Sequence, residues 1–158
     1  MPAFGAQGVE GKPLTSLDAW DTQDAAFHRR RPGVKPFGYL LTLDLYGCKP
    51  GASDDLGLCY DFLVELVGEL EMTTQSPPFI LRSPPEFPDK AGLSGWVPLI
   101  ESGIQIHTLV PKNFISIDIY CCHEFDAAKV VAFARKTFTP REVEMNQMAR
   151  GLKYHEVV

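Results

Sequence analysis

Apolar residues recur along the chain at two different spacings, which predicts both strands and helices. Strand-favouring residues fill 38–46, ahead of a cluster of turn residues. From Asp54 or Asp55 to Leu70 the apolar positions recur every three or four residues, which predicts a helix capped by aspartate. A second helix is predicted for 126–138, because it has an aspartate at its start, basic residues in its last turn and a proline soon after.

Five further stretches are predicted as strands or parts of strands. Six prolines lie between Pro77 and Pro98, so residues 79–81 can form only a short or edge strand. The other predicted strands are 93–100, 104–108, 114–122 and 142–148. This order predicts an α+β fold, a two-layer sandwich in which a mainly antiparallel sheet carries both helices on one face.

The alternation of apolar and polar residues within 114–122 predicts that the two faces of the sheet have different roles. Ile115, Ile117, Ile119 and Cys121 point one way and suit a core beneath the helices. Ser116, Asp118, Tyr120 and Cys122 point the other way, and this set is too polar for an ordinary core. We therefore expect the second face to meet a partner subunit or to hold an active site.

Composition narrows the class of protein. A chain of 158 residues with 45% hydrophobic residues fits one folded domain, and a net charge of -5 argues against nucleic acid or an anionic membrane as partner. It has neither a stretch apolar enough to span a membrane nor the pattern of a secretory signal. Four cysteines in such a chain are expected to be reduced thiols in the cytoplasm. Residues 1–36, rich in glycine and proline, are predicted to be a flexible N-terminal extension.

Several residues in the strand-rich region could carry chemistry. A serine and a histidine on an extended segment can act as nucleophile and base, and Ser94, Ser102 and His107 offer that pair of types. Cys122 lies beside a second cysteine and a histidine, but neighbours on a strand point to opposite faces and no CxxC pattern accompanies them. No metal site is therefore predicted.

The run from Gly92 to Thr108 resembles the core motif of the prokaryotic S-adenosylmethionine decarboxylase proenzyme family. It contains G-x-S-G at 92–95, E-S at 101–102 and I-H-T at 106–108, and Cys122 follows at the family's spacing. Further matches at both ends extend the similarity over about residues 37–156.

The resemblance implies that residues 37–158 form a pyruvoyl-dependent decarboxylase domain that cleaves itself between Glu101 and Ser102. The Ser102 hydroxyl would attack the Glu101 carbonyl, His107 would remove the α-proton, and Ser94 would assist. Elimination and hydrolysis would leave a pyruvoyl group, generated from Ser102, at the new N-terminus.

The resemblance also implies the activity and the assembly. The pyruvoyl group would form a Schiff base with S-adenosylmethionine and act as an electron sink during decarboxylation, a step of polyamine (spermidine) biosynthesis. Cys122, as a thiol protonated at neutral pH, would return a proton to the α-carbon. Active sites would lie at a homodimer interface, formed by the polar face of the sheet.

Three positions depart from the family pattern or align less closely. Pro111 stands where the family usually has the carboxylate that holds the ribose, and proline has no side-chain acceptor. Gly103 replaces a frequent histidine, and the aromatic residue that stacks on adenine corresponds to Phe87. An alternative is therefore a decarboxylase of the same family acting on L-arginine or L-ornithine. A third possibility, an inactive regulatory paralogue, is disfavoured because Ser94, Ser102, His107 and Cys122 are all present.

Overall fold

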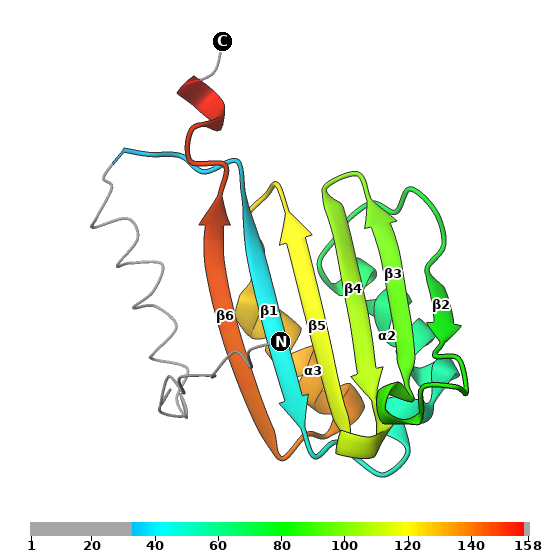
Figure 1. Ribbon diagram of the computed structural model, residues 1–158. Coiled ribbons are helices and arrows are strands. Elements are labelled where there is room, and N and C mark those ends of the chain that lie inside the picture. Colours follow the sequence, from blue (N-terminus) through cyan, green and yellow to red (C-terminus); the bar gives the residue numbers. More distant parts are fainter. Residues whose placement is uncertain (1–32, 157–158) are drawn as a thin grey trace, which may run out of the picture.

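Six strands form one antiparallel sheet in the order β2-β3-β4-β5-β1-β6 (Figure 1). The structure is a computed structural model that describes residues 33–156; residues 1–32, most of the predicted extension, lie outside the described residues. The strands are β1 (Gly38–Tyr46), β2 (Phe79–Arg82), β3 (Leu93–Leu99), β4 (Ser102–Leu109), β5 (Phe114–Cys121) and β6 (Glu142–Arg150). The predicted antiparallel sheet, with the proline-flanked strand at its edge, is confirmed.

Two helices, α2 (Leu56–Glu69) and α3 (Ala127–Phe138), cover the same face of the sheet (Figure 1). Each begins where its aspartate cap predicts. Asp55 accepts a hydrogen bond from the Leu58 N–H (2.9 Å), and Asp126 accepts one from the Ala128 N–H (2.9 Å). The two-layer architecture predicted from the sequence is therefore the observed one.

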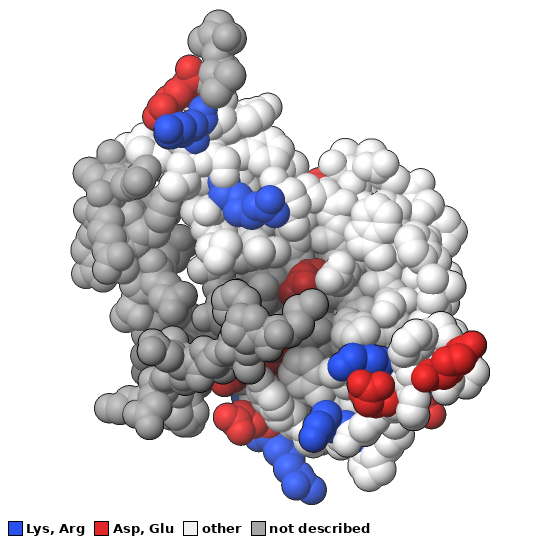
Figure 2. Space-filling view, viewed as in Figure 1, with Lys and Arg blue, Asp and Glu red and all other residues white. Residues whose placement is uncertain are grey.

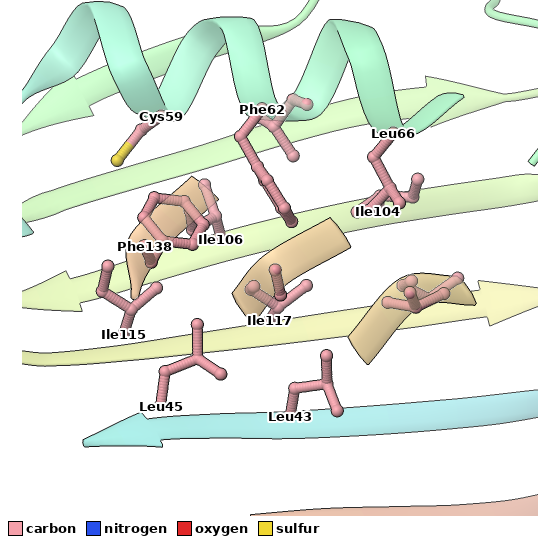
Figure 3. Packing of buried hydrophobic residues seen from close by; sticks show 14 of the residues in the cluster. Leu43, Leu45, Cys59, Phe62, Leu66, Ile104, Ile106, Ile115, Ile117 and Phe138 are labelled. Carbon is pink, nitrogen blue, oxygen red and sulfur yellow. The ribbon is translucent and has the colours of Figure 1, made fainter. Parts of the chain in front are cut away.

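The core lies between these helices and the sheet (Figure 3). Phe62 and Leu66 of α2 and Phe138 of α3 point toward the sheet (Figure 3). Ile117 of β5 and Leu43 of β1 belong to the same cluster and point from the sheet toward the helices. Every one of these side chains is almost fully removed from water. Burial of about 1.5–3 kcal/mol per large apolar side chain holds the two layers together.

One buried hydroxyl ties the sheet to the segment before α2. Thr108 Oγ1 donates a hydrogen bond to the Ser53 carbonyl (2.6 Å) and accepts one from the Leu93 N–H (2.9 Å). Thr108 is fully buried, so both backbone groups depend on this side chain. The contact fixes the start of β3 against the end of β4.

The other face of the sheet, here called the open face, carries the alternate residues of every strand. In β5 the isoleucines are buried under the helices while Ser116, Asp118 and Tyr120 are on the open face, as predicted. Figure 2 views this face: the part of it over β2, β3 and β4 that is not covered by grey atoms is largely uncharged, and acidic side chains lie recessed near the middle of the view. No helix within residues 33–156 is long and apolar enough to span a membrane.

The sequence misplaced the ends of some strands. β3 ends at Leu99, so Ile100 belongs to the following turn, and β4 begins at Ser102 rather than at residue 104. β6 continues to Arg150, beyond its predicted end at 148, because it pairs along the whole of β1. A period-two pattern fixes the face of each residue, but pairing with a neighbouring strand decides where the strand ends.

Candidate active site

The Glu101–Ser102 peptide lies in a tight hairpin between β3 and β4. Leu99 pairs with Ser102, so only Ile100 and Glu101 form the turn. Two-residue hairpin turns favour glycine or asparagine, and this one has neither. Ser102 instead has a φ of 137°, a conformation that side-chain-bearing residues rarely adopt. The backbone is therefore strained at the residue that follows this peptide bond.

Hydrogen bonds hold this strained turn in place. The Glu101 carbonyl accepts a hydrogen bond from the Cys122 N–H (3.0 Å). The Glu101 carboxylate accepts another from the Thr73 N–H (3.0 Å), and the Ile100 N–H donates to the Thr73 carbonyl (2.8 Å). An N–H group aimed at a carbonyl oxygen stabilises negative charge that develops there when a nucleophile adds. The Cys122 N–H therefore offers such a donor at the Glu101 carbonyl oxygen.

Cys122 directly follows Cys121, the last residue of β5. Cys121 is buried, and burial raises the pKa of its thiol, so it serves as part of the packing. Cys122 is partly exposed and lies beside the turn through its backbone N–H. Both cysteines are free thiols, and among residues 33–156 no group of His, Cys, Asp and Glu side chains is arranged to hold a metal ion.

Ser94 and His107 form a hydrogen-bonded pair of side chains on the open face. They sit opposite each other on β3 and β4, and Ser94 Oγ lies 2.9 Å from His107 Nδ1. This hydrogen bond orients the imidazole and leaves its other nitrogen for a further partner. The structure thus brings together two of the residues predicted for the site, although they are thirteen positions apart in the sequence.

The structure does not bring His107 to Ser102 within one chain. Both residues belong to β4 and are five positions apart, and a strand rises about 3.3 Å per residue, so their Cα atoms are separated by about 16 Å. Ser102 and Cys122 thus lie at what we call the hairpin end of the sheet, whereas Ser94 and His107 lie at its histidine end. One chain therefore holds these candidate residues in two separate groups, which we call half-sites.

Two carboxylates lie on the open face, one on β5 and one on β1. Asp118 accepts a hydrogen bond from the Gln105 amide (3.0 Å), and Asp44 lies on β1 opposite Ser116. Burial raises the pKa of Asp118, and the hydrogen bond from Gln105 partly offsets this. The pKa of Asp44 is raised by burial and then by the neighbouring charges of Glu144 and Asp118. Within residues 33–156 neither of these carboxylates forms an ion pair.

Comparison with known proteins shows what this arrangement belongs to. Residues 39–151 match the family model described as S-adenosylmethionine decarboxylase. The chain belongs to the S-adenosylmethionine decarboxylase family. A protein of Clostridium botulinum (strain Loch Maree / Type A3), named S-adenosylmethionine decarboxylase proenzyme, is 30% identical over 119 residues, which cover 75% of this chain and 97% of that protein.

The family is found in both bacteria and archaea, and the fold agrees. A proenzyme of the same name from Pyrococcus furiosus is 26% identical over 117 residues, covering 73% of this chain and 80% of that protein. The crystal structure of the adenosylmethionine decarboxylase from Aquifex aeolicus superposes with a TM-score of 0.62 at 24% identity, over 74% of this chain and 92% of that one. The predicted family and fold are confirmed.

The S-adenosylmethionine decarboxylase motif of this chain has a glycine after Ser102, and the structure explains why. A Cβ added at Gly103 would lie 2.5 Å from Nε1 of Trp96, whose indole packs over this position. Trp96 also meets the ring of Phe79 edge-on, with 5.7 Å between the centroids. Sequence analysis missed Trp96, Thr73 and the backbone N–H of Cys122, because their contacts depend on which strands are neighbours.

Phe87 and Pro111 lie near the histidine end. The Val110 N–H donates to the Ala91 carbonyl (2.8 Å), which joins the 83–92 loop to the 3-10 turn Val110–Lys112 after β4. Phe87 in this loop is 56% exposed, and Pro111 lies in the 3-10 turn. The only acidic residue within the loop's short 3-10 turn, Asp89, pairs with Lys90 (3.3 Å).

Proposed function

We propose that this protein is a self-processing, pyruvoyl-dependent decarboxylase of S-adenosylmethionine that acts in polyamine biosynthesis. Membership of the family supports the reaction class, and the relatives bear the name proenzyme. The observation that carries the proposal is the strained Ser102, whose preceding carbonyl is held by the Cys122 N–H.

Processing begins at the Glu101 carbonyl. The Ser102 hydroxyl attacks the carbonyl carbon, the Cys122 N–H stabilises the oxyanion, and the Glu101–Ser102 amide bond is exchanged for an ester. Loss of the Ser102 α-proton then breaks the ester Cβ–O bond. This releases Glu101 as a carboxylate and leaves a dehydroalanine at residue 102, which takes up water and loses ammonia. The strain at Ser102 raises the energy of the intact peptide and so favours the first step.

The base for the α-proton cannot be His107 of the same chain, because about 16 Å separates it from Ser102. A second copy removes this obstacle. We infer a homodimer in which the two open faces pack against each other, about 10 Å apart as packed sheets are. His107 of one chain then lies at the level of Ser102 of the other, and each dimer has two composite sites.

The position of the two residues on one strand defines the symmetry axis of this dimer. A two-fold axis along the strands would leave each residue at its own height on the sheet and would not bring His107 to Ser102. An axis across the strands, passing β4 between Ile104 and Gln105, reverses the strand direction and exchanges the two ends. The Ser94–His107 pair of one chain thereby meets the Ser102–Cys122 group of its partner.

The resulting composite site has groups suited to decarboxylation. The pyruvoyl group made from Ser102 supplies the electron sink for loss of carbon dioxide. Cys122, partly exposed beside that position, returns a proton to the substrate in this proposal. Phe87 lies at the histidine end, so in the dimer it approaches the partner's Ser102 and offers an aromatic surface to the substrate.

Two tests address this function. The intact mass of the denatured protein should reveal fragments 1–101 and 102–158, the second lighter by one ammonia than a chain that begins with serine. Carbon dioxide release is then compared for S-adenosylmethionine, L-arginine and L-ornithine. We expect S-adenosylmethionine to be used, whereas release from a basic amino acid alone would assign the specificity to the change at Pro111. A chain that stays uncut would contradict the enzymatic proposal and favour a regulatory paralogue.

Mixing two inactive variants tests the composite site. Ser102→Ala keeps His107 but lacks the hydroxyl, and His107→Ala keeps Ser102 but lacks the base. Neither is expected to cleave alone. When they are unfolded together and refolded, mixed dimers contain one intact site, so the His107→Ala chain should be cleaved in the mixture. Absence of cleavage there, with wild-type protein cleaved under the same conditions, would place the whole site within one chain.

A further inference from the structure

Charges of opposite sign are separated along β6 on the open face. Glu142 and Glu144 are exposed near its start, at the histidine end, and Arg150 is exposed at its last residue, at the hairpin end. The pairing of β6 with β1 fixes these levels, since Glu144 lies opposite Asp44 and Arg150 lies opposite Gly38. Lys153, also exposed, adds a second positive charge beyond Arg150. One strand of the sheet is therefore acidic at one end and basic at the other.

These charges have local contacts but no opposite charge nearby in the described part of the chain. The Arg150 guanidinium lies 4.2 Å from the centre of the Tyr120 ring, and Glu144 accepts a hydrogen bond from the Tyr46 hydroxyl (2.7 Å). Within residues 33–156 the ion pairs are Arg82–Asp54 and Lys90–Asp89. Glu144 and Arg150 are six residues apart on one strand, about 20 Å, so they cannot pair with each other.

The two-fold axis inferred above brings Glu144 of one chain close to Arg150 of the other. An axis that crosses β4 between Ile104 and Gln105 crosses β6 between Asn146 and Gln147, because these residues are aligned across the sheet. Glu144 then lies at the level of the partner's Ala149, next to the partner's Arg150. The two long side chains can span the gap of about 10 Å between packed sheets. The symmetry forms this contact twice.

We propose that Glu144 of each chain pairs with Arg150 of the other, and that these two ion pairs set the lengthwise register of the dimer. The proposal rests on the dimer put forward as part of the function. A slide of one sheet along the other by four residues separates Arg150 from the partner's Glu142 and Glu144 and also moves His107 away from the partner's Ser102. Arg150 and Glu144 are thus positioning residues, which act on the reaction by aligning the half-sites.

Charge reversal provides the test, because the pairs are reciprocal. Glu144→Arg places arginine against arginine, and Arg150→Glu places glutamate against glutamate. Each variant alone should self-associate at least about tenfold more weakly than the wild type and should process slowly. A mixture of the two should dimerise and cleave as the wild type does, since the mixed dimer restores both pairs. Sedimentation velocity gives the association, and denaturing mass gives the cleavage.

Controls separate this effect from misfolding and from a change of net charge. Glu65→Arg and Lys136→Glu make the same changes at exposed positions of α2 and α3, on the other side of the sheet, and should leave dimer and cleavage unaltered. Glu144→Gln and Arg150→Gln remove the attraction without repulsion and should give smaller losses that fade in high salt.

The outcomes distinguish this proposal from the function. If the wild type is a cleaved dimer and the reversed variants match it, or if their mixture is no better than either alone, the ion pair is refuted. If the wild type is itself uncut or monomeric, the proposed function or its dimer has failed, and the pair fails with it.

Discussion

The strain at Ser102 leads to a prediction that can be measured on uncleaved protein. Ser102→Ala and Ser102→Gly both remove the hydroxyl, so both should remain intact. They differ in how they tolerate a φ of 137°, which alanine adopts as reluctantly as serine and glycine adopts readily.

The expected difference follows from two opposing effects. Backbone strain of this kind costs about 1–3 kcal/mol, and glycine removes it. Glycine also loses more conformational freedom on folding, which costs roughly 0.5–1 kcal/mol relative to alanine. We therefore expect Ser102→Gly to exceed Ser102→Ala in free energy of unfolding by about 1 kcal/mol, or about 2–4 °C in melting temperature for a chain of this size.

Urea and thermal unfolding of the two variants would measure this difference, with intact mass confirming that neither is cleaved. Ser116→Ala and Ser116→Gly on β5 are the matched control, because Ser116 has no positive φ. There the order should reverse, with alanine more stable. If alanine is also the more stable residue at 102, the strain is not present in the folded protein and the reasoning about the first step of processing fails.

Three further predictions concern the sheet and its open face. Thr108→Val leaves the two buried backbone partners of its hydroxyl unpaired and should lower the free energy of unfolding by about 2–4 kcal/mol, whereas a loss below about 1 kcal/mol in urea unfolding would mean that they find other partners. Gly103→Ala should cost about 1 kcal/mol by displacing the indole of Trp96, and a double-mutant cycle with Trp96→Ala should recover most of it. Asp44 has a folded-state pKa above the ordinary 3.8, so the folded chain holds its proton more tightly and this residue destabilises the protein progressively as pH rises above about 4. Asp44→Asn should therefore raise the melting temperature at pH 7 and have little effect at pH 3; an equal effect at both pH values would contradict the assigned cause.

The sequence predicted the two faces of the sheet because burial has the same period as the strand. The alternation of isoleucine with polar residues in 114–122 needs only that successive side chains point to opposite sides. The starts of the helices could also be predicted from the sequence, since Asp55 and Asp126 cap the helices through residues two or three positions away. The ends of the strands were harder to predict. β4 begins at Ser102 because Leu99 pairs with it across the turn, and that pairing has no signature in the local sequence.

For the candidate site, the sequence by itself determined the residue types and the family, because the spaced motif from Gly92 to Thr108 is a local property of the chain. Only the tertiary structure decided which of those residues meet. Ser94 and His107 are thirteen positions apart and lie within hydrogen-bond distance, since antiparallel strands place distant residues side by side. Ser102 and His107 are five positions apart and stay about 16 Å away from each other, since an extended strand cannot fold back on itself.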